Sequence, residues 1–148
     1  EEYNLEKHKK INQALLSLIG KAEIILVDSF SHSPTLFSVV DNADETIFIT
    51  NDDFPSIVKS KEAINKMEDL GMNVIGIILN RKKKDTNKKH IAAILNKPII
   101  SEIPYDEKLI QSINTKKPHF LLYPNSSISK AIKELAELIN LEASSIKK

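Results

Sequence analysis

Short, nearly continuous runs of Ile, Val and Leu alternate along the chain with longer segments in which apolar residues recur at helical spacing. Continuous rather than alternating hydrophobicity is typical of strands that are buried on both faces, as in parallel sheets. The pattern therefore predicts four buried parallel strands. They are Glu23–Asp28, Thr46–Thr50, Asn73–Asn80 and Pro98–Ile103.

The segments before, between and after these strands predict five amphipathic helices. In Ser127–Leu141, apolar residues recur at the spacing of helical turns and form a continuous stripe. Phe54–Leu70 also has boundary signals, since Asp53 can cap its start and Gly71 can end it. The other predicted helices are Asn4–Ile19, Thr86–Asn96 and Asp106–Asn114.

The alternation of strands and helices predicts an α/β fold, a doubly wound and mostly parallel sheet with helices on both faces. The chain has 148 residues, which is enough for one hydrophobic core, and no linker-like change in composition divides it. We therefore expect a single domain over residues 1–148, with a frayed polar tail over residues 142–148.

Composition narrows the classes of function. The chain has 21 basic and 20 acidic residues, a formal net charge of +1, so it lacks the excess positive charge of a general polyanion-binding protein. The absence of cysteine excludes disulfides, thiolate metal sites and thiol catalysis, and the four histidines are scattered without metal-ligand spacing. No secretory leader is visible, so we expect a cytoplasmic location.

Polar residues follow the predicted strands, and ligands of a doubly wound sheet bind beyond the carboxyl ends of its strands. Asp28 can hold a magnesium-bound water there, or else make a turn or cap a helix. Asn80 offers the donor and acceptor that an adenine edge requires, or else it bonds to nearby backbone. Pro104, Tyr105 and Asp106 can line the same pocket, or form a turn in which the aspartate caps the next helix.

A phosphate-cradling loop does not occur in these 148 residues. The chain has only three glycines, and neither GxxxxGK[ST] nor GxGxxG is present. Such a loop supplies the backbone N–H groups and the lysine that hold nucleotide phosphates. We therefore expect that the chain alone does not bind nucleotide phosphates tightly.

A basic run, Arg81–His90, follows the third predicted strand. It can contact the phosphates of DNA or an anionic membrane surface. No aromatic residue is interleaved with the lysines for base stacking. We therefore interpret the run as mainly a solvated loop.

The order of these motifs resembles the C-terminal half of the MinD/ParA-type ATPases, the deviant Walker A group of P-loop proteins, with MinD as the closest subgroup. The resemblance covers about Lys21–Leu141. It is carried by ILVDS (25–29), ADETIFITNDDFPSIVKS (43–60), GMNVIGIILNR (71–81), KPIISEIPYDE (97–107) and KPHFLLYPNSSISKAIKELAELI (117–139).

The resemblance implies roles for the residues that match the family's motifs. Asp28 would be the Walker B aspartate, which meets Mg²⁺ through water, and Asn80 would be the asparagine that contacts adenine. Pro104, Tyr105 and Asp106 would form the loop around the base and ribose. ATP and Mg²⁺ are therefore the cofactors that the resemblance implies for the intact ATPase.

The resemblance also implies a function, namely ATP-dependent spatial regulation such as division-site or chromosome and plasmid positioning. In that family ATP drives homodimerisation and attachment to a membrane or DNA, and a regulatory protein partner stimulates hydrolysis. The protein would then be cytoplasmic or peripheral to the membrane. Because the sequence begins at Glu1 rather than Met, we expect it to be the C-terminal portion of such an ATPase. The alternatives are a nucleotide-free protein-interaction domain that keeps the fold, and a metallocentre-maturation ATPase of the same superfamily.

The purified chain of 148 residues is expected to show no ATP hydrolysis above background, because it lacks the loop and lysine that bind the β- and γ-phosphates. A phosphate-release assay with ATP and Mg²⁺ measures this. Turnover that the substitution Asp28→Asn abolishes would contradict the expectation.

Overall fold

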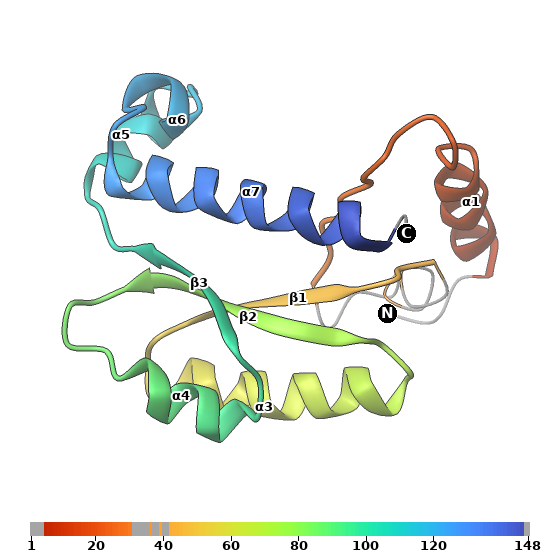
Figure 1. The fold of residues 1–148 in the computed structure, drawn as a ribbon, viewed down its shortest axis with the longest axis horizontal. Coiled ribbons are helices and arrows are strands. Elements are labelled where there is room, and N and C mark those ends of the chain that lie inside the picture. The colour runs from red at the N-terminus through yellow and green to blue at the C-terminus, as the bar shows by residue number, and fades with distance from the viewer. Residues whose placement is uncertain (1–4, 31–35, 37–38, 40–41, 147–148) are drawn as a thin grey trace.

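The computed structural model describes residues 5–30, 36, 39 and 42–146. Its centre is a parallel sheet of three strands in the order β1-β2-β3. They are β1 (Thr46–Asn51), β2 (Val74–Lys82) and β3 (Ile99–Pro104), and Figure 1 shows their arrangement. The predicted parallel sheet and the last three of its four predicted strands are therefore confirmed.

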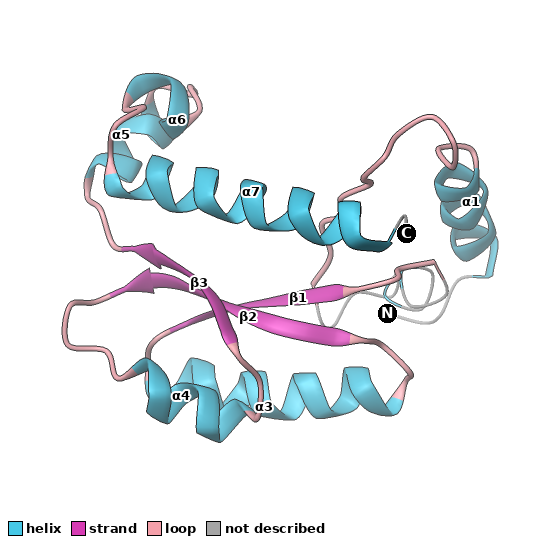
Figure 2. Cartoon of the chain, in the orientation of Figure 1, coloured by secondary structure: helices cyan, strands magenta, loops and turns pink. Residues whose placement is uncertain are grey.

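Helices cover both faces of this sheet (Figure 2). On one face lie α3 (Phe54–Asp69) and α4 (Lys88–Leu95), while α7 (Ser127–Ile146) crosses the other face and contacts β3. The main apolar core lies between the sheet and the first pair of helices, and Ile77 and Leu79 of β2 are fully buried in it. This arrangement is the α/β fold that the alternation of patterns predicted.

Local signals set the ends of α3 and α4. The carboxylate of Asp53 accepts the backbone N–H of Ser56 at 3.0 Å and caps α3. Gly71 follows that helix with φ of 88°, a left-handed conformation that glycine adopts at little cost. Asn87 caps α4 in the same way, and Asn96 ends it with φ of 55°. The start and stop signals predicted for α3 are confirmed.

The first predicted strand, Glu23–Asp28, is not a strand in the structure. Residues 24–30 form no regular secondary structure, and the side chain of Leu26 is 78% exposed. The prediction was wrong because an apolar segment becomes a strand only when its backbone pairs with a neighbouring strand. Within the described ranges, neither this segment nor the outer edge of β1 has such a partner.

Two helical parts project from these layers (Figure 1). One is α1 (Leu5–Leu16), and the other is a lobe made by α5 (Lys108–Asn114) and the short α6 (His119–Leu122) near the start of α7. The sequence pattern did not predict α6. The last helix continues to Ile146 and so includes most of the predicted tail, whose final residues 147–148 lie outside the described part.

None of the helices in the described part of the chain has both the length and the apolar character needed to cross a membrane.

Replacing Gly76 with alanine is expected to lower the free energy of unfolding by about 1–3 kcal/mol. A Cβ atom there would lie 2.5 Å from Cγ2 of Ile100, and a β-branched side chain is too stiff to turn away freely. Urea unfolding measures the change. The cost of Gly76→Ala should fall in an Ile100→Ala background, and an equal cost in both backgrounds would argue against this steric explanation.

Candidate functional site

The carboxyl ends of β2 and β3 bring four of the predicted site residues to one edge of the sheet. Asn80 lies near the end of β2, and Pro104 ends β3 beside Lys82. The backbone N–H of Tyr105 donates to the carbonyl of Lys82 at 3.0 Å, and Asp106 follows directly. Parallel pairing thus places these residues where ligands of such sheets bind.

The side chain of Asn80 is partly used by the local backbone. Its Oδ1 accepts the N–H of Arg81 at 3.0 Å, which is the bond that the alternative interpretation of this residue describes. A carboxamide has two N–H donors and a second acceptor lone pair beyond this bond. The hydrogen bond therefore orients the amide and leaves it able to meet the edge of a ligand.

Arg81 is held in a strained conformation beside this amide. Its φ is 55°, in the left-handed region that side chains disfavour, and strain of this kind is often found at functional sites. Its guanidinium carbon lies 5.8 Å from the centre of the Tyr105 ring, within the range of a cation–π interaction. The ring is half-exposed and offers a flat apolar surface at the sheet edge.

Asp106 has a clear local role. Its Oδ1 accepts the backbone N–H of Lys108 at 2.9 Å, which satisfies a donor in the first turn of α5. This is the capping role that the sequence left open as an alternative. A contact between this carboxylate and a ribose stays a prediction.

Asp28 makes no hydrogen bond or ion pair with these residues. It is exposed, it belongs to the segment that forms no strand, and it makes no hydrogen bond or ion pair with any other described residue either. The described part of the chain also contains no group of three or more His, Cys, Asp or Glu side chains placed to hold a metal ion. A magnesium ion here would need most of its oxygen ligands from water and phosphate, which is how Mg²⁺ commonly binds.

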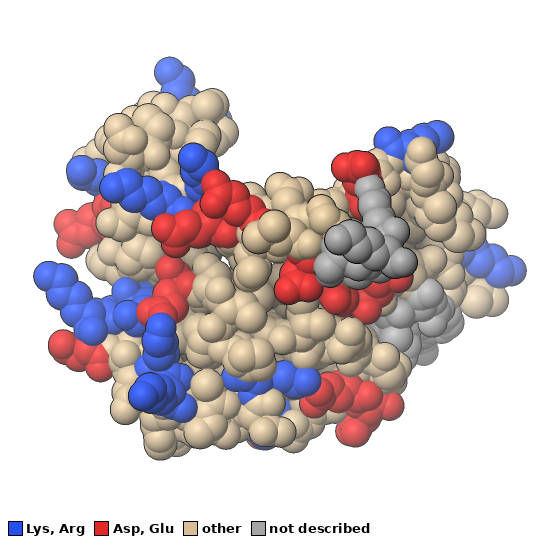
Figure 3. Space-filling model, in the orientation of Figure 1, with Lys and Arg blue, Asp and Glu red and all other residues tan. Residues whose placement is uncertain are grey.

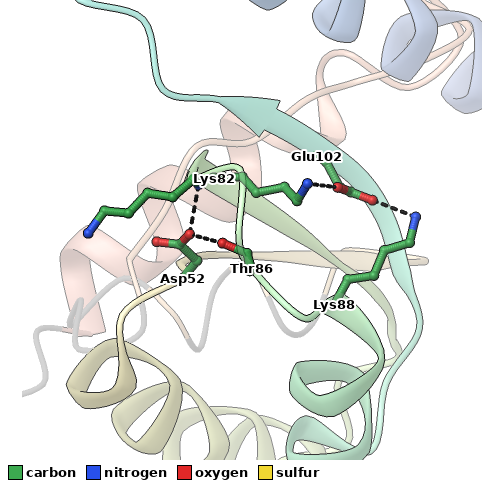
Figure 4. Close-up of polar contacts among 6 residues, drawn as sticks. Asp52, Lys82, Thr86, Lys88 and Glu102 are labelled. Carbon is green, nitrogen blue, oxygen red and sulfur yellow. Dashed lines mark hydrogen bonds and ion pairs between the residues drawn. The ribbon is translucent and has the colours of Figure 1, made fainter.

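Asp52 ties the end of β1 to the basic loop after β2. Its Oδ2 accepts the backbone N–H of Lys83 at 2.8 Å and a hydrogen bond from the Thr86 hydroxyl (Figure 4). Burial works to raise the pKa of Asp52, but these two hydrogen bonds and the charge of Lys83 outweigh it and hold the pKa below its ordinary value. The loop is thus anchored by a carboxylate that stays charged.

Glu102 of β3 holds two lysines of the same basic run (Figure 4). Its carboxylate lies 2.6 Å from Nζ of Lys88 and 2.9 Å from Nζ of Lys82. The hydrogen bond from Lys88, followed by that from Lys82, lowers the pKa of Glu102. Residues 81–90 are mainly exposed, as expected, and only Lys82 and Thr86 are half-buried. The ends of this run belong to β2 and α4 rather than to a loop, and the carboxylate of Glu102 pairs with Lys82 and Lys88.

An open cavity of about 380 Å³ lies between this basic loop and the first turns of α7. Its lining combines four lysines with two glutamates, and Figure 3 shows basic and acidic side chains gathered at this end of the molecule. Of the predicted site residues, only Pro104 lines it. The lining residues are Lys82, Lys83, Lys84, Glu102, Pro104, Ser127, Lys130, Ala131 and Glu134.

Sequence analysis missed the roles of Asp52 and Glu102. Asp52 was visible as one of several polar residues after the second predicted strand, but its partners Lys83 and Thr86 come from a loop more than thirty positions later, at separations of 31 and 34. Glu102 interrupts an apolar strand, and a charged residue there signals that a partner of opposite charge lies nearby. Only the strand register identifies which lysines those partners are.

Comparison with known proteins shows what this fold and edge resemble. No protein-family model matches the chain. It is 28% identical over 141 residues to a protein of Methanocaldococcus jannaschii that is described as an ATP-binding protein. The aligned region covers 92% of this chain and 53% of the relative. The chain therefore spans about half the length of that relative.

Solved structures of MinD are similar to the chain over most of its length. The MinD cell division protein of Aquifex aeolicus matches with a TM-score of 0.78 and 25% identity over 89% of this chain and 60% of that one. MinD of Pyrococcus horikoshii, solved with Mg-ADP, matches with a TM-score of 0.78 and 23% identity over 95% of this chain and 59% of that one. The Aquifex protein has also been solved as a MinC:MinD complex.

These comparisons confirm the resemblance to the C-terminal part of MinD/ParA-type ATPases and the P-loop NTPase-like fold that it implied.

Replacing Glu102 with glutamine is expected to lower the free energy of unfolding near neutral pH by about 1 kcal/mol, because two ion pairs lose their shared charge. The pKa of Glu102 is lowered on folding, so its contribution exists above the unfolded-state pKa and disappears as the pH falls through the folded-state pKa. Urea unfolding of wild type and Glu102→Gln across acidic and neutral pH should show the two converging in acid. Glu137→Gln on the exposed side of α7 is the control, and a pH-independent difference for Glu102→Gln would count against the ion-pair explanation.

Proposed function

We propose that this chain provides the base-binding side of the ATP site in a MinD-like ATPase that acts in spatial regulation, such as division-site or chromosome and plasmid positioning. The observation that carries the proposal is the position of Asn80 beside the loop Pro104–Asp106, at the carboxyl edge of a sheet that resembles MinD. The ATP-binding description of the Methanocaldococcus relative supports the same ligand.

The residues at this edge suit an adenine ring. The carboxamide of Asn80 can donate to a ring nitrogen and accept from the exocyclic amine, and its bond to the Arg81 N–H fixes its direction. The exposed ring of Tyr105, which Arg81 contacts, provides a flat surface for stacking near the base. The strained backbone at Arg81 is already held in place by the surrounding sheet, so the base would meet a preformed site.

The phosphate side of the site needs groups that these 148 residues do not provide, because no phosphate-cradling loop occurs in the sequence. In the proposed site Asp28 would accept hydrogen bonds from water on Mg²⁺, since it is exposed and has no described partner that would compete. Bound Mg-ATP would supply the phosphoryl group that is hydrolysed. The residues of this chain orient the base and, through Asp28, a magnesium-bound water.

Partners follow from the same proposal. The MinC:MinD complex of Aquifex aeolicus is the model for a regulatory protein partner, and we propose a homodimer and a contact with a membrane or DNA surface for the intact protein.

A nucleotide-free interaction domain is the second candidate, and one observation favours it. Both polar side chains assigned to the base, Asn80 and Asp106, accept backbone N–H groups of their own neighbours. These bonds are sufficient to explain both residues as structural. Nucleotide binding that depends on the Asn80 side chain distinguishes the two candidates.

Replacing Asn80 with alanine in the natural protein is expected to weaken ATP binding by roughly five- to 150-fold, equivalent to about 1–3 kcal/mol, because a base edge is left unpaired. The urea midpoint should change less, since the side chain lies near an open strand end where water can replace it. Calorimetric titration with ATP and urea unfolding give the two values, and Asn140→Ala on α7 is the control. Unchanged affinity together with lower stability would make Asn80 a structural turn residue and favour the second candidate.

A further inference from the structure

The α5–α6 lobe carries five exposed apolar side chains. Leu109, Ile110 and Ile113 of α5 are 36%, 57% and 67% exposed, and Phe120 and Leu121 of α6 are 48% and 71% exposed. These five come from two short, consecutive helices that project beyond the start of α7 (Figure 1). Isolated apolar residues on a surface are ordinary, but a group of large ones on one projecting element marks an interaction surface.

The two helices of the lobe and the loop between them carry basic charges only, while Asp106 and Glu107 directly precede α5. Residues 108–123 include Lys108, Lys116 and Lys117 and contain no Asp or Glu. Two of these lysines lie in the loop between the helices that carry the apolar side chains, and all three are exposed. Among the described residues, Lys116 and Lys117 form no ion pair, so their charges are available to an anionic partner.

Buried polar contacts hold the lobe in this orientation. The ring of His119 is buried, with Nδ1 2.9 Å from Oγ of Ser112 in α5 and Nε2 2.9 Å from Oγ of Ser126 before α7. Because His119 faces inward on the short helix α6, the next two residues, Phe120 and Leu121, face solvent. Their exposure is thus a consequence of a fixed structure.

We propose that the α5–α6 lobe docks on an anionic lipid surface. Apolar side chains at a projecting tip can enter the boundary between headgroups and acyl chains, while neighbouring lysines meet lipid phosphates or carboxylates. A convex tip suits a fluid membrane, whereas the apolar anchors of a protein interface fill pockets of the partner. This inference extends the surface contact of the proposed function, but it needs no nucleotide and is tested without one.

The chain contains no tryptophan, so a single introduced tryptophan reports on its own surroundings. In Leu121→Trp, vesicles of phosphatidylcholine with about one-third phosphatidylglycerol should shift the emission to the blue, and pure phosphatidylcholine should do so far less. Leu141→Trp is the matched control, because Leu141 is 70% exposed on α7, outside the lobe. No shift in Leu121→Trp, or an equal shift in both variants, would overturn the proposal.

Sedimentation of the chain with the same vesicles separates the apolar and electrostatic contributions. The double variant Phe120→Ser with Leu121→Ser should lose on the order of tenfold or more in partition coefficient. Lys116→Glu with Lys117→Glu should lose roughly 25-fold or more, from about fivefold for each lysine. Lys59→Glu with Lys66→Glu makes the same charge change on α3, on the opposite face of the sheet, and should bind nearly as wild type.

Urea unfolding of each variant checks that the fold is kept, which we expect because the replaced side chains are exposed. Vesicle binding that the lobe variants leave unchanged would overturn the proposal. So would binding of the chain to DNA or to an acidic amphipathic peptide through the same residues with none to vesicles. Loss of ATP binding in Asn80→Ala bears on the nucleotide site alone, so the two proposals can fail separately.

Discussion

The pairing of β2 with a strand on each side is the constraint on which the rest of the structure depends. β2 is the central strand, and its Ile77 and Leu79 are fully buried, so its register cannot slip without moving apolar side chains out of the core. That register places Asn80 beside the end of β1 and Lys82 beside Pro104. Because both pairings are parallel, the carboxyl ends of all three strands meet at one edge of the sheet. The polar residues that follow the strands therefore lie at this edge, where ligands of such sheets bind.

Two carboxylates then fix the loop that leaves β2. Asp52 holds it from the side of β1 through Lys83 and Thr86, and Glu102 holds it from β3 through Lys82 and Lys88. A run of lysines that the sequence places in one stretch is therefore partly neutralised by acids from neighbouring strands. The two ion pairs with Glu102 reduce the net positive charge of this segment.

The sequence predicted those parts of the fold that depend on local pattern. The amphipathic stripe after Ser127, the Asp53 cap and three of the apolar strands are visible in the local pattern, and the structure has each of them. The prediction of a strand at Glu23–Asp28 was wrong because strand formation depends on a pairing partner as well as on composition. The predicted strand ends showed in advance where the polar site residues lie. Which side chains these residues pair with depends on the strand register, which the sequence pattern does not give.

The loop after β3 belongs to both of the surfaces for which function is proposed. The Tyr105 N–H bonds to β2, and Asp106 caps α5, which begins the lobe. A change at Asp106 would release the first turn of α5 and disturb the lobe together with the loop that we propose to face the base. Changes at Phe120 or Leu121 leave both of those hydrogen bonds in place, because these side chains face solvent. The proposed nucleotide site and the proposed lipid-docking surface therefore share the segment Tyr105–Asp106 and differ in the residues beyond it. Substitutions at the exposed lobe residues can for this reason change one proposed activity without changing the other.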